Sequence, residues 1–186
     1  MKRLLRQVPN TLTGLRLVAA PIAAHLILER MDLAALCVFG FAGLSDALDG
    51  FLAKRFGLTS RFGAWLDPAA DKLLMLASFV TLTVIGAVPL WLTGLVVGRD
   101  AAIVLGVGLA RLLDAPLRVA PLMVGKASTA MQVLYVATVL LLLALDMRRP
   151  QLELTGAIAV AVLTVWSFFA YGRVGLQALA ARRRTV

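Results

Sequence analysis

The sequence predicts an all-α fold, a polytopic membrane bundle with six transmembrane helices. Of its 186 residues, 61% are hydrophobic and only 16% are charged, whereas an ordinary soluble domain has roughly 25% charged residues. A water-soluble fold of this length buries only about two-thirds of its unfolded surface, so it would expose large apolar patches. The apolar residues are grouped into stretches near the ~20 residues that a helix needs to cross a bilayer. We therefore expect one transmembrane domain over residues 1–186, without sheet.

Five apolar stretches account for these six helices, because the longest stretch contributes two. The longest one, the uncharged run Leu73–Gly98, exceeds what one untilted span needs. Gly86–Pro89 is its natural break, because proline removes a backbone donor and clashes with the preceding turn. The expected helices are 11–28, 33–48, a third that ends near residue 88, 90–112, 127–145 and 155–170.

The distribution of basic residues predicts that both termini lie in the cytoplasm. Six helices place both termini on one side of the membrane, and cytoplasmic loops carry an excess of Lys and Arg. The loops opposite the termini hold three basic residues, Arg30, Arg148 and Arg149. The side of the termini holds thirteen: Lys2, Arg3, Arg6, Lys54, Arg55, Arg61, Arg111, Arg118, Lys126, Arg173, Arg182, Arg183 and Arg184. Cytoplasmic loops and anionic headgroups thus explain the net charge of +9, and we expect no nucleic-acid partner.

Four carboxylates embedded in apolar helices are the most informative residues. Asp46 and Asp49 are three positions apart on the second expected helix. Asp67 and Asp71 are four positions apart on the third, so each pair lies on one helical face. A charge at the centre of a span costs about 2.5–3.5 kcal/mol, so a bundle that keeps several is expected to use them. The intervening loop allows the helices to turn back and bring the four carboxylates together, where their repulsion requires a cation.

The donor atoms indicate which cation this is. Oxygen ligands without His or Cys favour Mg²⁺, Mn²⁺ or Ca²⁺ over zinc, and Mg²⁺ usually completes its coordination with substrate phosphates. The small residues Gly50, Ala53 and Gly63 would let a bulky ligand lie against the helix backbone, and they would equally allow close helix packing. A helix cap or ion pairs with nearby basic residues would explain one or two of the acids, but not four.

A cation transporter is the alternative class of protein, since it also needs intramembrane acids. Transporters of that kind are commonly built from inverted repeats. The other half of the sequence contains no second group of four aspartates. The pattern therefore favours an enzyme.

These residues resemble the signature of the CDP-alcohol phosphotransferase family, D-x-x-D-G-x-x-A-R, eight residues, G-x-x-x-D-x-x-x-D. The segment Asp46–Asp71 matches it in residue type and spacing, except for Lys54 where the family usually has arginine. Lysine keeps the charge but loses the bidentate fork, so a phosphate contact could pass to Arg55. The opening P-N-T-L-T-G-L-R, residues 9–16, resembles that of the phosphatidylglycerophosphate synthase and cardiolipin synthase branches. The resemblance thus covers most of the chain.

Two further motifs are more similar to the cardiolipin synthases. G-R-D at residues 98–100 and G-K-A-S-T-A-M-Q at residues 125–132 resemble their G-R-D and S-K-x-N-T-x-x-Q, and residues 167–173 are similar to the same branch. Gly125 and Ser128 depart from that pattern. The glycerophosphate branch more often has G-R-E and G-K-x-K-T-x-x-Q, with a second lysine at the position of Ser128.

The resemblance implies metal-dependent transfer of a phosphatidyl group from CDP-diacylglycerol to an alcohol, with release of CMP. It implies two Mg²⁺ or Mn²⁺ ions, and Asp71 as the general base. The implied metal ligands are Asp46, Asp49, Asp67 and Asp71, and the implied nucleotide-binding residues are Gly50, Ala53, Lys54 and Gly63. It further implies a homodimer in the bacterial inner membrane, or in the mitochondrial inner membrane of a eukaryote, with the active site toward the cytoplasmic side.

The acceptor is expected to be phosphatidylglycerol, as in a cardiolipin synthase, and glycerol 3-phosphate is the alternative. Both acceptors carry a phosphate, so a second basic pocket is required. The candidates are Arg99, Arg118, Lys126 and Arg16. Arg99 could instead pair with Asp100, and Arg118 could be a topology charge. Phosphatidylglycerol carries one phosphodiester charge and glycerol 3-phosphate nearly two, so Ser128 in place of a second lysine favours the lipid.

Overall fold

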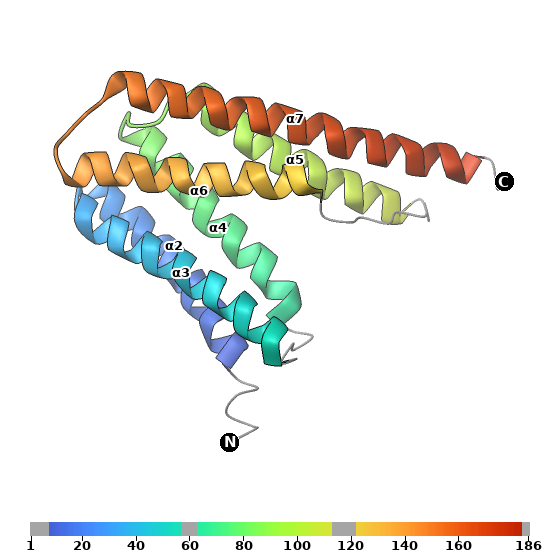
Figure 1. Cartoon of the computed structure of the whole chain (residues 1–186), viewed down its shortest axis with the longest axis horizontal. Helices are drawn as coiled ribbons and strands as arrows, with labels where there is room; N and C mark the ends of the chain where they lie inside the picture. Colours follow the sequence, from blue (N-terminus) through green and yellow to red (C-terminus); the bar gives the residue numbers. More distant parts are fainter. Residues whose placement is uncertain (1–7, 57–62, 113–121, 184–186) are drawn as a thin grey trace. The chain divides into compact units, whose positions relative to one another are not determined.

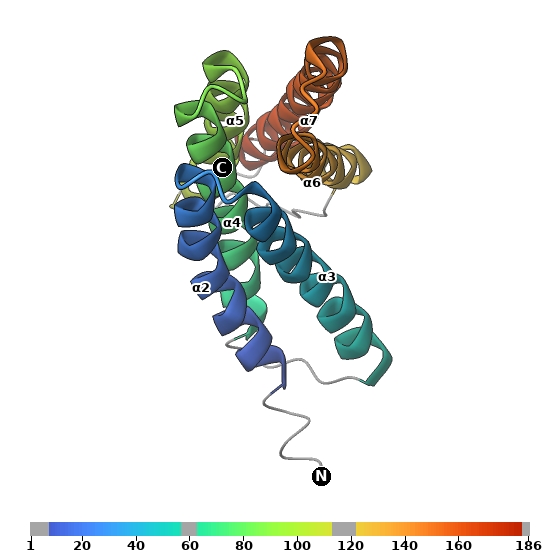
Figure 2. The same ribbon diagram turned by 90° about the vertical axis from the view of Figure 1, so that its left-hand side faces the viewer.

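The computed structural model of the chain is all-α (Figures 1 and 2). Every regular element within the described residues is an α-helix, so the all-α part of the predicted fold class is confirmed for that part of the chain. The structure describes the backbone of residues 8–56, 63–112 and 122–183, and the side chains of residues 14, 16–45, 72–109, 112 and 122–177. The helices are α2 (Val8–Leu28), α3 (Asp32–Phe56), α4 (Gly63–Val84), α5 (Leu90–Leu112), α6 (Met123–Ala144) and α7 (Pro150–Arg183).

Within the residues whose side chains the structure describes, three helices are long and apolar enough to cross a membrane. The segments are Leu90–Leu109 of α5, Met123–Ala144 of α6 and Pro150–Gln177 of α7. Within the described side chains, the other helices carry shorter apolar segments, Arg16–Leu28, Asp32–Ser45 and Lys72–Val84. Large apolar side chains such as Phe41, Leu105 and Phe169 are exposed, as expected of side chains that face lipid.

The helix bounds agree with the expected span at α5 and differ elsewhere. α3 continues past Leu48 to Phe56, so Asp46 and Asp49 lie inside the helix. α7 extends beyond the expected 155–170 at both ends: Pro150 suits a first helical turn, and no proline follows Ala170. α2 and α6 also begin about one turn earlier than expected. α4 ends at Val84 and not near residue 88, because a left-handed residue stops it.

Three helices end in the same hydrogen-bonded turn, in which one residue adopts a left-handed conformation. The left-handed residues are Arg30 (φ 61°), Gly86 (φ 74°) and Asp146 (φ 51°). After α2, the N–H of Met31 donates to the Leu26 carbonyl (2.9 Å) and that of Arg30 to Ile27 (3.2 Å). The same pair of bonds recurs after α4 and α6, which identifies three Schellman caps. Each cap satisfies the last carbonyls of its helix and lets the next helix begin within a few residues.

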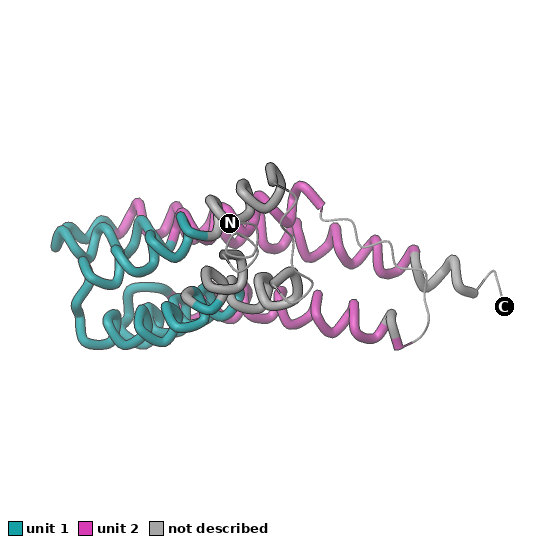
Figure 3. Tube along the Cα trace, turned by 90° about the horizontal axis from the view of Figure 1, so that it is seen from below, with its two compact units in different colours: residues 1–88, 136–149 teal, residues 89–135, 150–186 magenta. Residues whose placement is uncertain are grey.

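The chain divides into two compact units (Figure 3). Unit 1 comprises residues 1–88 and 136–149, and unit 2 comprises residues 89–135 and 150–186.

In unit 1, α2 packs against both α3 and α4 (Figure 2). Its buried face includes Ala20 and Ala23, whose small side chains let helices approach closely in a membrane. Phe39 of α3 and Phe79 of α4 are buried in the same unit. α3 runs toward the end of the unit where α2 begins, and α4 starts from that same end (Figure 2).

In unit 2, α5 packs against α7. The first half of α6 contacts α7 through side chains, among them Ser128 with Thr164 and Gln132 with Thr164. These helices therefore bury polar groups as well as apolar ones.

Candidate functional site

The signature residues occupy one end of unit 1, on two successive helices. Asp46 and Asp49 lie in the last part of α3, with Gly50, Ala53 and Lys54 after them. Gly63 is the first residue of α4, and Asp67 and Asp71 follow in its first turns. Residues 57–62 connect the helices, and a connection of six residues spans at most about 25 Å. The two halves of the signature therefore lie toward the same end of the unit (Figure 2).

The side chains of the signature residues lie outside the described residues. The convergence of the four carboxylates, the metal site and the nucleotide contacts therefore stay predictions. Among the side chains that the structure does describe, no group of three or more His, Cys, Asp or Glu could hold a metal ion. The four aspartates remain the candidate ligands.

Arg16 is a buried cation of unit 1. Its side chain is only 1% exposed, and it lies in the first half of α2, the half nearest the signature end of the unit (Figure 2). A buried arginine needs counter-charge and hydrogen-bond acceptors around it. The burial of Arg16 therefore makes it part of the interior of this end of the unit, and not a surface topology charge.

A second polar cluster lies in unit 2, around Arg99 of α5. The arginine is 7% exposed. Its Nη1 donates to Oδ1 of Asp100 at 2.6 Å, and its Nη2 donates to Oγ of Ser167 on α7 at 2.5 Å. Its Nε is buried and has no hydrogen-bond partner among the described residues. Because a guanidinium has five N–H donors in a rigid fork, Arg99 retains donors for an anionic ligand while two of its donors hold it in place.

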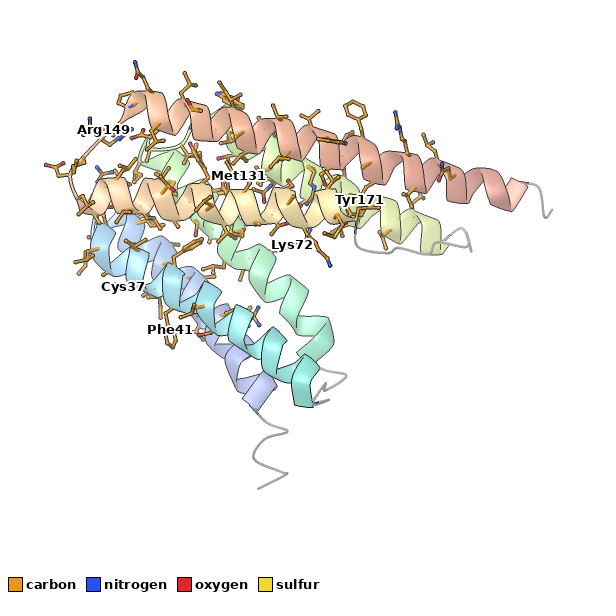
Figure 4. All side chains as sticks on the ribbon, viewed as in Figure 1. Cys37, Phe41, Lys72, Met131, Arg149 and Tyr171 are labelled. Carbon is orange, nitrogen blue, oxygen red and sulfur yellow. The ribbon has the colours of Figure 1, made fainter. Side chains whose placement is uncertain are left out.

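Tyr171 of α7 joins this cluster to the start of α6 (Figure 4). The centroid of its ring lies 5.7 Å from Cζ of Arg99, within the range of a cation–π interaction. Its hydroxyl accepts a hydrogen bond from the backbone N–H of Leu122, at 3.3 Å. Gly125 makes room for it: a Cβ at position 125 would lie 2.6 Å from the tyrosine hydroxyl oxygen.

A buried hydrogen-bond network continues along α6 and α7. The Ser128 and Thr164 hydroxyls are 3.4 Å apart, and Nε2 of Gln132 donates to Thr164 at 3.2 Å and to Ser128 at 3.5 Å. All three side chains are at most 2% exposed. Polar side chains in a membrane interior find partners on neighbouring helices, and this network ties α6 to α7.

The candidate acceptor residues have different surroundings. Arg99 is buried and pairs with Asp100, which was the alternative interpretation of the sequence. Lys126 is exposed on the first turn of α6, next to Gly125. Arg118 lies outside the described residues. Arg99 and Lys126 thus belong to the same unit, and Tyr171 contacts Arg99 directly and the first turn of α6 through Leu122.

Sequence reasoning did not assign Tyr171, Ser167 or Thr164 to a site. A signal was present, because Thr164, Ser167 and Tyr171 are spaced three and four apart and therefore lie on one face of α7. Ser128 and Gln132 have the same four-residue spacing on α6. Matching polar stripes on two apolar helices predict a polar contact between them, although they do not identify the pairs.

Comparison with known proteins identifies the family to which the chain belongs. The family model for CDP-alcohol phosphatidyltransferase matches residues 6–169. This range includes the signature of unit 1 and, in unit 2, Arg99, Asp100 and Ser167, whereas Tyr171 lies two residues beyond it. The resemblance that the motifs indicated is therefore confirmed.

Individual relatives come from both expected branches. The chain is 30% identical to a human cardiolipin synthase (CMP-forming) over 198 residues, which cover 92% of the chain. It is 41% identical to a cardiolipin synthase (CMP-forming) of Streptomyces coelicolor, over 56% of the chain. It is 34% identical to the chloroplastic CDP-diacylglycerol–glycerol-3-phosphate 3-phosphatidyltransferase 1 of rice, over 72% of the chain. The matched regions span 64%, 51% and 46% of these relatives.

Proposed function

The chain belongs to the CDP-alcohol phosphatidyltransferase family, and on this basis we propose that it transfers a phosphatidyl group from CDP-diacylglycerol to an alcohol, with release of CMP. The observation that carries the proposal is the signature from Asp46 to Asp71, with one half in the last part of α3 and the other in the first turns of α4. The family model matches residues 6–169, which include parts of both units, so we treat residues 1–186 as one catalytic domain.

The donor set at this end of unit 1 fits two Mg²⁺ or Mn²⁺ ions. It consists of carboxylates alone, which suits hard divalent cations that share ligands with phosphates. The proposed ligands are Asp46, Asp49, Asp67 and Asp71. When bound, such ions supply Lewis-acid stabilisation of the charge that develops on the phosphate oxygens.

The protein's own residues supply the proton transfer and the orientation of substrates. Asp71 takes the proton of the acceptor hydroxyl at a carboxylate oxygen as that hydroxyl attacks the phosphatidyl phosphorus. A new phosphorus–oxygen bond forms to the acceptor, and the bond from that phosphorus to CMP breaks. Lys54 offsets the charge of the nucleotide phosphates. Gly50, Ala53 and Gly63 leave the helix backbone accessible to the cytidine.

We assign the acceptor as phosphatidylglycerol, which makes the chain a cardiolipin synthase. The assignment rests on the number of positive charges that unit 2 offers to the acceptor's phosphate. Asp100 pairs with Arg99 at 2.6 Å and offsets its charge, so Lys126 provides the excess positive charge among the candidates of unit 2 whose side chains are described. One excess charge matches the single negative charge of a phosphodiester better than the nearly two charges of glycerol 3-phosphate. The similarity to cardiolipin synthases over 92% of the chain supports the same assignment.

The lengths and charges of the turns support a proposed membrane topology. We place six helices across the membrane with both termini in the cytoplasm. The turns that follow α2, α4 and α6 are short and carry few basic residues, whereas the termini and the other connections carry most of them. α7 has 34 residues and is therefore about 51 Å long, longer than the ~30 Å hydrocarbon core. Its basic end then reaches the cytoplasm.

Localisation and assembly rest on the family alone. We propose the inner membrane of a bacterium, or of mitochondria in a eukaryote, with the active site toward the cytoplasmic side, and a homodimer.

Glycerol 3-phosphate remains the competing acceptor, because the rice relative named for it is similar over 72% of the chain. The experiment that separates the two is incubation of the purified protein with CDP-diacylglycerol and each acceptor, with Mg²⁺ or Mn²⁺ and after chelation. We expect CMP and cardiolipin with phosphatidylglycerol, in the presence of metal. A preference for glycerol 3-phosphate of tenfold or more would reassign the acceptor within the family.

A further inference from the structure

Tyr171 contacts both Arg99 and the residue that precedes α6. We propose that it is a positioning residue, which holds the first turn of α6, and with it Lys126, in place relative to Arg99. The two cations of the acceptor site are thereby presented together to the acceptor's phosphate. This inference rests on the proposed function, because that function supplies the phosphate-bearing acceptor.

The link from Tyr171 to Lys126 runs through two hydrogen bonds. The tyrosine hydroxyl accepts from the N–H of Leu122 at 3.3 Å, and the carbonyl of Leu122 accepts from the N–H of Lys126 at 3.2 Å. Leu122 directly precedes α6, so its N–H is one of the groups that no helix carbonyl satisfies. The hydroxyl therefore fixes the residue from which the first turn of α6 starts. Lys126 lies at the end of that turn.

The link from Tyr171 to Arg99 is made by the ring. The guanidinium carbon lies 5.7 Å from the ring centroid, and the same guanidinium is held by Asp100 and by Ser167, one turn before Tyr171 on α7. Its buried Nε has no hydrogen-bond partner among the described residues. Arg99 is thus oriented by three neighbours and still has a donor to offer. Because Tyr171 and Ser167 both belong to α7, they fix the guanidinium of Arg99 relative to that helix.

Gly125 is required for this arrangement. A Cβ at position 125 would lie 2.6 Å from the hydroxyl oxygen, 2.9 Å from Cε2 and 3.1 Å from Cζ of Tyr171. Any larger residue would push the tyrosine away from Leu122. Gly125 stands where the motif of the cardiolipin synthases has serine. Its contact with Tyr171 explains why this chain has glycine at that position.

The experiment uses the full chain in detergent micelles with four variants: Tyr171→Phe, Gly125→Ala, the double variant and the control Tyr135→Phe. Two constants are measured. The first is the Kd of inorganic phosphate by calorimetry, which needs no turnover. The second is the KM of the acceptor, compared with kcat and with the KM of CDP-diacylglycerol. Tyr135→Phe removes a hydroxyl from a tyrosine on the same helix pair, which also packs against a glycine, and should change neither constant.

Tyr171→Phe keeps the ring and removes only the hydroxyl. We expect it to raise the phosphate Kd and the acceptor KM about threefold to tenfold, the effect of one hydrogen bond, while kcat and the donor KM stay within about twofold. Gly125→Ala keeps Tyr171 and Lys126 and should shift both constants in the same direction. Because both variants break the same link, the double variant should be no worse than the more affected single one.

The positioning role is overturned if Tyr171→Phe leaves both constants within twofold, if it lowers kcat alone, or if the effects of the two substitutions multiply. Wild-type protein that does not bind phosphate would overturn it as well. Should Tyr171→Phe fail to fold, Gly125→Ala carries the same test. Phosphate binding without any transfer from CDP-diacylglycerol would contradict the proposed function, and the Kd values would still decide the role of Tyr171.

Discussion

Gly156 of α7 lies directly against the ring of Tyr135 on α6. A Cβ at position 156 would lie 2.8 Å from Cδ2 and 3.1 Å from Cε2 of the tyrosine, and Tyr135 is only 4% exposed. Gly125 of α6 accommodates Tyr171 of α7 in the same way. Each helix thus places a tyrosine against a glycine of the other. The two contacts fix the antiparallel register of this helix pair, because neither tyrosine can shift without meeting a larger residue.

Gly156→Ala should therefore destabilise the protein. The added methyl group overpacks a buried ring, which typically costs about 1–3 kcal/mol. The measurement is the thermal midpoint in detergent, which should fall. Gly94→Ala is the matched control, since no atom lies within 4 Å of a Cβ at position 94 on α5, and it should leave the midpoint unchanged or slightly raised. Equal effects of the two substitutions would contradict the packing argument.

The sequence predicts the helices well because apolar stretches and their interruptions are local signals. Gly86, which ends α4, is recognisable from the sequence as a helix-breaking residue. The caps at Arg30 and Asp146 have the same hydrogen bonds, but neither residue signals a left-handed conformation as glycine does. Helix ends are therefore predicted less well than helix centres.

The site residues that the sequence predicts are those of one type at a fixed spacing. The residues that it does not predict are those whose contacts depend on how the helices pack. The aspartates are recognisable from their spacing in a single sequence. The pair of Arg99 with Asp100 is suggested by adjacency. The contact of Arg99 with Ser167, 68 positions away, and that of Tyr171 with Gly125 depend on how α5, α6 and α7 meet, which no local pattern specifies.

Ser128→Lys tests the balance of charge at the acceptor site. It adds the cation that the glycerophosphate branch usually has, so the ratio of rates should shift from phosphatidylglycerol toward glycerol 3-phosphate. Ser128 is fully buried beside Thr164, and the bulk of lysine will disturb this contact. Ser128→Met adds similar bulk without charge and serves as the control. An equal shift in both variants would show that bulk, and not charge, changes the ratio.

Substitutions of Lys54 test how the protein binds the donor, CDP-diacylglycerol. Lys54→Ala should raise the KM of CDP-diacylglycerol about tenfold, which is the effect of losing one charge-assisted hydrogen bond. The kcat should change little, because the lost interaction stabilises the ground state and the transition state equally. Lys54→Arg should be tolerated or should lower the donor KM, since arginine adds a bidentate fork. An unchanged donor KM in Lys54→Ala, together with a raised one in Arg55→Ala, would transfer the phosphate contact to Arg55.

The most direct test of the central claim is the rate of CMP release from CDP-diacylglycerol by purified Asp49→Ala and Asp67→Ala proteins. Each substitution removes a proposed metal ligand from a different helix without making the span more polar. Asp146→Asn, outside the signature, is the control, because asparagine also adopts the left-handed conformation of that residue. We predict metal-dependent release by the wild-type and control proteins, and less than about a tenth of that rate in either signature variant. More than about a tenth of the wild-type rate in either variant, or undiminished release after chelation, would contradict the claim that these carboxylates hold the ions that catalysis requires.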